Sequence, residues 1–258
     1  MSPLTNMSEE KGVAFITGAG KRIGHHLALS LSYEGWSIAA HYNQSEDGVS
    51  ELCNEIKRRG GKVITLKADL KNEAEVIPLI SKCEKELGLP SLLINCASVF
   101  HKDELQTMEG QIFDEQIAIN LKAPLLLSQA FAKAHNDISE ASSKGQANII
   151  NITDQRVHQL NPTFFSYTLT KVGLSTATTT MAQALAPNIR VNAIAPGPVL
   201  QSIHQTEDEF NNECEGTLLG QGTTPEEIFE TVKFILNTKS LTGETITLDG
   251  GQHLKWSS

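Results

Sequence analysis

Short apolar runs rich in β-branched residues alternate along this chain with longer stretches that have helical spacing. The runs predict seven strands, at residues 12–17, 36–42, 62–67, 92–95, 147–152, 190–195 and 245–248. The stretches between them predict helices at residues 25–33, 48–59, 74–87, 113–135, 165–186 and 225–237. Parallel strands need long crossovers, which are usually helical. The alternation therefore predicts a single-domain α/β protein, a doubly wound Rossmann fold with a seven-stranded parallel sheet.

Two stretches break this alternation, and both follow the carboxyl end of a predicted strand. They are residues 100–110 and residues 196–224. Ligands of open α/β sheets bind beyond the carboxyl ends of the strands, so we expect these stretches to form the walls of a substrate pocket, with a substrate-loop insertion at 198–224. The acidic part of this loop, within 200–216, is interpreted as a solvated mobile flap. Residues 1–11 are interpreted as a flexible leader, and 12–258 as the domain.

Composition excludes several classes of protein. The 258 residues carry a net charge of -9 without a cluster of Lys and Arg, so we expect no nucleic-acid partner. The four cysteines are scattered, which predicts reduced thiols and a cytoplasmic location. Histidines, cysteines and carboxylates show no metal-ligand spacing, so no metal is expected. There is no apolar run of about 18 residues, so we expect no membrane span. A small molecule remains as the expected substrate.

A glycine-rich turn, TGAGKRIG at residues 17–24, lies between the first predicted strand and the first predicted helix. Glycines there allow backbone N–H groups to approach a pyrophosphate, which the positive end of the helix dipole also attracts. The turn predicts a dinucleotide site whose contacts include Gly18, Lys21, Arg22 and Ile23.

The end of the second strand bears on the choice between NAD and NADP. NAD sites usually place an Asp or Glu there for the ribose 2'-hydroxyl, but residues 41–45 contain no carboxylate. We therefore expect NADP(H), with Glu46 and Asp47 just beyond the strand as the opposing observation. The expected contacts at this end are His41, Tyr42, Asn43 and Ser45. The alternative is that Asn43 and Ser45 only shape the loop and cap the next helix.

Tyr167 and Lys171 are four residues apart in a predicted helix and therefore share one face. A nearby cation favours the ionised form of a tyrosine and lowers its pKa, so the pair can exchange a proton with a substrate oxygen or nitrogen during hydride transfer. Taken alone, a tyrosine and a lysine at this spacing are common on protein surfaces.

Together, the motifs resemble the short-chain dehydrogenase/reductase family over nearly the whole chain. The matching segments are 17–24, 68–70, 95–98, Asn120, Tyr167 with Lys171, 196–197, 242–243 and 249–251. The resemblance implies that Tyr167 donates a proton, that Lys171 binds the nicotinamide ribose and lowers the tyrosine pKa, and that Asn120 positions a relay water. It also implies a homo-oligomer, commonly a tetramer, with helices 113–135 and 165–186 at the interface. The cofactor contacts that it adds are Asp69, Leu70, Asn95, Ala97, Ser98, Pro196 and Gly197.

In two departures from the usual family pattern, the chain resembles the pteridine reductases and their dihydromonapterin and dihydrofolate reductase relatives. Asp154 stands where the family usually has a serine, 13 residues before Tyr167, and Arg22 replaces the third glycine. Phe100 matches a phenylalanine that stacks on the pterin ring, which would lie between it and the nicotinamide. The resemblance implies reduction of a pterin C=N, with Arg22, Ser98, Phe100, Asp154 and Tyr167 as the substrate contacts.

Other interpretations remain open. Asp154 could cap a helix in a general carbonyl reductase, acting on a ketone or a 3-oxoacyl compound, whose substrate is activated by Thr153. Phe100 could be a core residue. A catalytically weak nucleotide-binding redox sensor is the third possibility, against which the intact Asn120, Tyr167 and Lys171 count.

Overall fold

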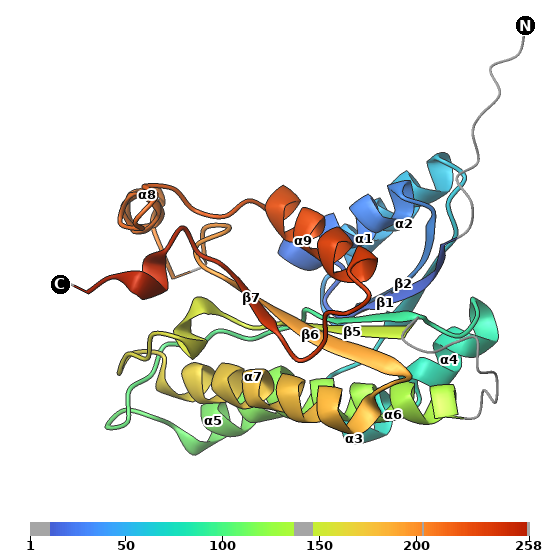
Figure 1. Cartoon of the computed structure of the whole chain (residues 1–258), viewed down its shortest axis with the longest axis horizontal. Coiled ribbons are helices and arrows are strands. Elements are labelled where there is room, and N and C mark those ends of the chain that lie inside the picture. Colours follow the sequence, from blue (N-terminus) through green and yellow to red (C-terminus); the bar gives the residue numbers. More distant parts are fainter. Residues whose placement is uncertain (1–10, 137–146, 203, 257–258) are drawn as a thin grey trace, which may run out of the picture.

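A seven-stranded parallel sheet forms the centre of the molecule (Figure 1). The computed structural model describes residues 11–136, 147–202 and 204–256, so the predicted leader lies outside the described residues except for Lys11. The strands are β1 Gly12–Ile16, β2 Trp36–Tyr42, β3 Val63–Lys67, β4 Leu92–Asn95, β5 Ala147–Ile152, β6 Ile189–Pro196 and β7 Thr245–Leu248. Their order is β3-β2-β1-β4-β5-β6-β7, and every neighbouring pair is parallel. The predicted fold is confirmed.

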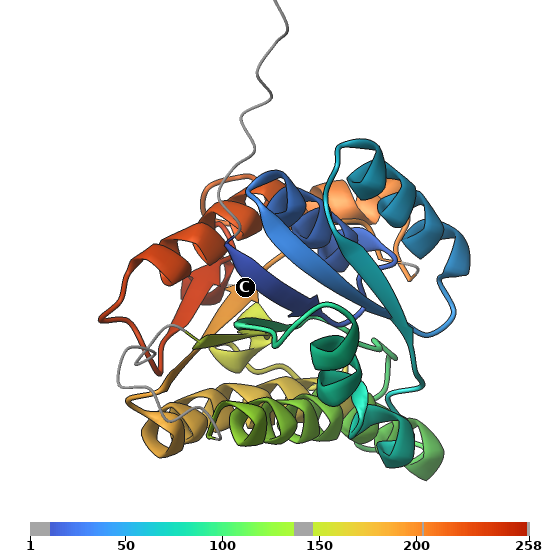
Figure 2. The ribbon, with the colours of Figure 1, turned by 90° about the vertical axis from the view of Figure 1, so that its right-hand side faces the viewer.

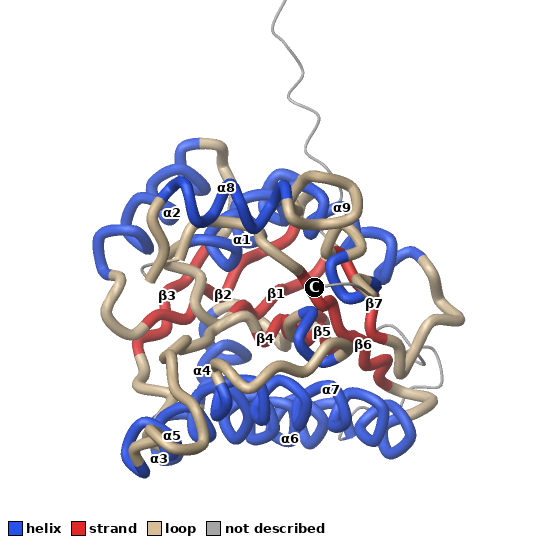
Figure 3. Tube along the Cα trace, turned by 90° about the vertical axis from the view of Figure 1, so that its left-hand side faces the viewer, coloured by secondary structure: helices blue, strands red, loops and turns tan. Residues whose placement is uncertain are grey.

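Helices cover both faces of the sheet, as the view along the strand ends shows (Figure 3). One face packs against α1 Arg22–Tyr33, α2 Glu46–Arg58 and α9 Pro225–Asn237. The other face packs against α3 Glu73–Val76, α4 Leu79–Glu86, α6 Ala123–Asn136 and α7 Phe165–Leu185. None of the helices in the described ranges is long and apolar enough to cross a membrane.

The central strand shows why the sequence produces two cores. Side chains alternate across a strand, so Val13 and Phe15 of β1 enter the core under α6 and α7, whereas Ala14 and Ile16 enter the core under α1 and α9. All four are buried. A strand that is apolar on both faces is stable only between two helical layers, which is the arrangement found here.

Two long helices that the sequence predicts are divided in the structure. The segment 74–87 forms α3 and α4, because Pro78 has no N–H to continue the first helix and instead caps the second. The segment 113–135 forms α5 Gly110–Ile117, a π-helical turn at Ala118–Lys122 and then α6. Such π-turns occur often at functional sites.

The acidic stretch after β6 contains a helix, α8 Glu207–Glu215, where we expected only a solvated flap. None of its residues is buried, so it has no apolar stripe for periodicity to detect. The sequence feature that indicates this helix is a capping box, in which Thr206 and Glu209 exchange hydrogen bonds between side chain and backbone.

The direction in which successive strands are added to the sheet changes between β1 and β4. β2 and β3 extend the sheet on one side of this point, and β5, β6 and β7 extend it on the other. The carboxyl ends of β1 and β4 therefore border the crevice in which doubly wound folds bind their ligands.

Candidate active site

The glycine-rich turn leaves β1 and passes close to the end of β4. Gly18 has a φ of 69°, and a Cβ there would lie 3.0 Å from the Cα of Ala97, so only glycine fits. The Thr17 hydroxyl accepts hydrogen bonds of 2.9 Å from the N–H groups of both Cys96 and Ala97. These contacts fix the turn against the segment that carries Ala97 and Ser98.

The beginning of α1 is suited to an anion. Its N-cap residue, Lys21, makes no side-chain cap, and no acidic residue stands in the first turn. The N–H groups at this end of the helix, the positive end of the helix dipole and two basic side chains thus combine at one place. Ile23 is half-buried against the core below α1.

Arg22 adopts a left-handed backbone with a φ of 54°, which explains why the family usually has glycine at this position. Its guanidinium donates to the carbonyls of Gln201 at 2.7 Å and Leu200 at 2.9 Å. Arg22 therefore ties the nucleotide turn to the loop after β6. The expected contact of Arg22 with a pterin oxygen stays a prediction, and a substrate would have to compete with these two carbonyls.

At the end of β2, His41 is buried and acts as a structural link. Its Nδ1 accepts the Gly18 N–H at 3.2 Å, so Nε2 carries the proton and donates to the Ala68 carbonyl at 3.2 Å. Burial lowers the pKa of His41 to about 4. Thus His41 holds the nucleotide turn to the strand ends rather than offering a free donor to a cofactor.

Lys67 is a basic residue at this end of the site that the sequence analysis missed. It lies at the end of β3, pairs with Glu46 and is 6.0 Å from the ring centre of Tyr42. The carboxylate that we expected to oppose a 2'-phosphate is thus neutralised by a cation. Asn43 and Ser45 lie half-buried beside this pair, and Ser45 precedes α2 without a side-chain cap, contrary to the capping alternative.

The remaining expected cofactor contacts also lie at strand ends. Asp69 and Leu70 follow β3, and Asp69 Oδ1 accepts the Lys71 N–H in a local turn. Asn95 ends β4 and donates to Asn151 at 2.9 Å. Pro196 ends β6, and a Cβ on the next residue, Gly197, would lie 2.8 Å from the backbone of Asp249.

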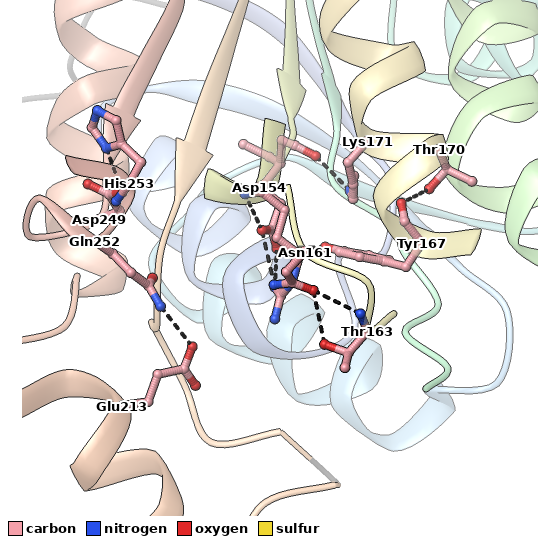
Figure 4. A network of polar contacts seen from close by, with 12 residues as sticks. Asp154, Asn161, Thr163, Tyr167, Thr170, Lys171, Glu213, Asp249, Gln252 and His253 are labelled. Carbon is pink, nitrogen blue, oxygen red and sulfur yellow. Dashed lines mark hydrogen bonds and ion pairs between the residues drawn. The ribbon is translucent and has the colours of Figure 1, made fainter. Parts of the chain in front are cut away.

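Asp154, Tyr167 and Lys171 converge beyond the end of β5 (Figure 4). The Tyr167 hydroxyl donates to Asp154 Oδ2 at 3.0 Å, and the Lys171 ammonium donates to the Ile152 carbonyl at 2.9 Å. Tyr167 and Lys171 project from successive turns of α7 and are buried, as the spacing of four predicts.

The pKa of Tyr167 differs from the sequence expectation. Burial raises it well above its usual value, and the Asp154 carboxylate raises it further. We expected Lys171 to lower this pKa, but burial lowers the pKa of Lys171 itself to about 8. The cation that acts in the expected direction is Arg156, which the sequence analysis did not consider.

Asn120 lies in the π-helical turn and is fully engaged with the segment after β4. Its Oδ1 accepts the Val99 N–H at 2.8 Å and the Ser98 hydroxyl at 3.1 Å, and its Nδ2 donates to the Val99 carbonyl at 2.9 Å. It therefore orients Ser98 and the approach to Phe100. Its expected role in positioning a water stays a prediction.

Asp154 combines a capping contact with a contact to the tyrosine. Its carboxylate does cap a short 3-10 helix, Gln155–Val157, by accepting the Arg156 N–H. The same carboxylate also accepts the Tyr167 hydroxyl. Thr153, the alternative group for activating a carbonyl, is buried and donates to the Ile194 carbonyl at 3.0 Å. Asp154, and not Thr153, therefore faces the tyrosine.

Phe100 is half-buried and belongs to an aromatic group rather than to either core cluster. Phe164 stacks on it with a centroid distance of 4.1 Å and an interplanar angle of 5°. Tyr167 meets it in an edge arrangement at 4.7 Å. A flat substrate stacked on Phe100 has to use the face opposite Phe164 or displace Phe164.

Asp103 also positions the site and gave no recognisable sequence signal. It is buried and accepts hydrogen bonds from the N–H and the hydroxyl of Ser166, while its carbonyl accepts the Phe165 N–H at 3.1 Å. These contacts anchor the N-terminus of α7 directly before Tyr167.

Residues 12–212 match the family model described as short chain dehydrogenase. The chain belongs to this family. Among its relatives, the FabG 3-oxoacyl-(acyl-carrier-protein) reductase of Staphylococcus epidermidis is 29% identical over 249 residues, which are 93% of this chain and 98% of that protein. The uncharacterized oxidoreductase YjdA of Bacillus subtilis is 30% identical over 250 residues, covering 95% and 97% of the two chains.

The solved structures include one with greater sequence identity. FolM alternative dihydrofolate reductase 1 from Brucella canis, complexed with NADP, superposes with a TM-score of 0.90. It is 37% identical, and the match covers 98% of this chain and 97% of that one. The chain is thus an oxidoreductase of the short chain dehydrogenase family with a fold nearly the same as that of a dihydrofolate-reducing relative.

Proposed function

We propose that this protein is an NADPH-dependent reductase of a pterin-type C=N bond. The observation that carries the proposal is the 3.0 Å hydrogen bond from Tyr167 to Asp154, beside the ring of Phe100. The likeness to the FolM structure, crystallised with NADP, supports it.

The residues at the strand ends fit a dinucleotide with a 2'-phosphate. The uncapped start of α1 with Lys21 offers donors to a pyrophosphate, and Gly18 allows the turn before it to pack against Ala97. Lys67, beside Tyr42, offers a cation near the place of the 2'-phosphate, while its partner Glu46 is exposed and free to turn away. The nicotinamide supplies a hydride to the substrate.

The proton is supplied by the protein. Tyr167 donates its hydroxyl proton to the nitrogen of the C=N bond while the adjacent carbon receives the hydride, and solvent then reprotonates the tyrosine oxygen. Asp154 holds the hydroxyl in the site through the observed hydrogen bond, and the hydroxyl turns from Oδ2 to the substrate nitrogen when it donates its proton. Lys171, held by the Ile152 carbonyl, lies 5.5 Å from the Tyr167 ring centre, and its ammonium would bind the nicotinamide ribose. Phe100 supports the flat substrate by stacking.

The experiment that tests this function is NADPH oxidation with dihydrobiopterin, dihydromonapterin and dihydrofolate, run beside a ketone panel and repeated with NADH. We expect turnover of at least one pterin with NADPH. Turnover of ketones alone would contradict the proposal.

A general carbonyl reductase is the second candidate, because the FabG relatives match over 93% of the chain. Two observations count against it: Asp154 stands at the usual serine position, and the hydroxyl of the neighbouring Thr153 is engaged in a buried hydrogen bond. NADPH binding without turnover of any substrate would instead favour the nucleotide-binding redox sensor.

A further inference from the structure

Arg156 is a partly buried cation next to the proposed proton donor, and none of the roles above uses it. It lies in the 3-10 helix after β5, and its side chain is 16% exposed. Its Nη1 lies 3.2 Å from Oδ1 and 3.4 Å from Oδ2 of Asp154, and its backbone N–H also donates to Oδ1 at 2.9 Å. Asp154 Oδ2 in turn accepts the Tyr167 hydroxyl. The three residues form one continuous hydrogen-bonded chain.

Two aromatic rings hold the guanidinium in place. Its central carbon is 5.2 Å from the ring centre of Phe164 and 5.6 Å from that of Phe100. Its Nε is buried without a hydrogen-bond partner, so the guanidinium interacts with Asp154 and the two rings through its other atoms.

The contact between Arg156 and Asp154 reduces a charge repulsion that the proposed proton transfer creates. When Tyr167 gives up its proton, its oxygen becomes an anion 3.0 Å from the Asp154 carboxylate. Two like charges this close in a buried site oppose the proton transfer. A cation fixed to the far side of the carboxylate offsets that repulsion and also sets the direction in which Oδ2 points.

We propose that Arg156 is a positioning residue that neutralises and orients Asp154 so that Tyr167 can donate its proton. The proposal rests on the proton-donor role of Tyr167 in the proposed function, but it does not depend on whether the substrate is a pterin. The direction of the Arg156 effect on the pKa of Tyr167, which is to lower it, agrees with this role.

The test compares variants of Arg156 by steady-state kinetics with NADPH and the best substrate of the pterin and ketone panels. Arg156→Lys keeps the charge, whereas Arg156→Met keeps the apolar stem without the charge. We expect Arg156→Met to lower kcat at least tenfold with little change in KM, and Arg156→Lys to retain most of kcat. We expect the titration in the pH profile of kcat to move to higher pH in Arg156→Met, because loss of a cation makes proton binding to the Asp154–Tyr167 pair more favourable.

A double-mutant cycle with Asp154→Asn identifies the residue through which Arg156 acts. In the Asp154→Asn background the carboxylate charge is gone, so Arg156→Met should lower kcat by less than threefold. Arg59→Met is the matched control, since Arg59 also pairs with a carboxylate and lies 4.1 Å from a tyrosine ring centre, but on the exposed surface of α2. It should leave kcat unchanged.

Three outcomes would overturn the proposal. The first is an equal loss of kcat in both backgrounds, and the second is a rise in KM alone. The third is that the effects of the Arg156 and Asp154 substitutions are non-additive in the melting temperature but additive in kcat. The pair would then have a purely structural role. Ketone turnover without pterin turnover would refute the proposed function, yet the cycle could still be measured with the ketone.

Discussion

At the residue scale, the site is built from charged groups whose burial changes their chemistry. Burial lowers the pKa of Lys171 to about 8, and burial together with the Asp154 carboxylate raises the pKa of Tyr167. Both shifts oppose the charged form. The hydroxyl of Tyr167 therefore keeps its proton at neutral pH, and the Asp154 carboxylate makes release of that proton harder unless a cation offsets its charge.

Replacing Tyr167 by Phe tests the proton donor directly. We expect kcat to fall by roughly 100- to 10,000-fold, because the substitution removes the proton and leaves the ring in place. NADPH affinity, measured by fluorescence titration, should change little. Tyr33→Phe is the control, since Tyr33 is exposed and its hydroxyl donates to Glu55. Near-normal turnover of Tyr167→Phe would refute the assignment.

Burial of His41 makes the free energy of unfolding depend on pH. Its pKa is about 4 in the folded protein and 6.5 without burial, so the unfolded chain binds the proton more readily. The stability that His41 contributes is complete above pH 6.5 and is lost as the pH falls toward 4, about 3 kcal/mol in all. Urea unfolding at several pH values should show a smaller acid loss in His41→Gln than in wild type. His25→Gln, at a half-exposed position, should keep the wild-type slope.

At the element scale, α7 carries the reactive groups and is fixed at its beginning. Asp103 caps its N-terminus, and Phe164 precedes it in a left-handed conformation that costs roughly 1–3 kcal/mol. This strained residue is also the one that stacks on Phe100. The loop geometry before α7 therefore determines both the aromatic wall and the direction of Tyr167.

Replacing Asp103 by Ala should weaken this end of α7. We expect the free energy of unfolding to fall by about 2 kcal/mol, because the substitution removes two hydrogen bonds to Ser166 and a carboxylate at a helix N-terminus. We also expect kcat to fall, because Tyr167 lies in the first turn of α7. Asp114→Ala, at an exposed position in α5, should change stability by less than about 0.5 kcal/mol. Equal stability of the two variants would contradict the role of Asp103.

At the scale of the whole molecule, the oligomeric state follows from the family resemblance and stays a prediction. α6 and α7 lie side by side on the same face of the sheet (Figure 2). Leu169 of α7 is 44% exposed there, so it can reach a second copy in the predicted interface.

Light scattering after size exclusion should give the mass of a tetramer. Leu169→Glu should shift the population to smaller species, because it places a charge in the predicted interface. Leu105→Glu is the matched control, since Leu105 is also an exposed leucine but lies outside both interface helices. A monomer in wild type at micromolar concentration would contradict the expected tetramer.

The sequence by itself determined the order of strands and helices, the parallel sheet and the shared helix face of Tyr167 and Lys171, whereas Asp154 was expected from the family resemblance. These features follow from local periodicity, from glycine where the backbone requires it and from a helical spacing of four. The break at the π-turn and the exposed helix α8 had only weak local signals, since a π-turn interrupts no apolar pattern and α8 buries no residue.

Only the tertiary structure decided which distant groups meet. His41 on Gly18, Lys67 on Glu46 and Asp103 on Ser166 each join residues more than 20 positions apart. The Arg156 contact is local in sequence, yet its direction depends on Phe100 and Phe164. Periodicity records which face a residue occupies but not which loop lies opposite, so burial, and with it the pKa of Tyr167, is fixed only when the chain folds.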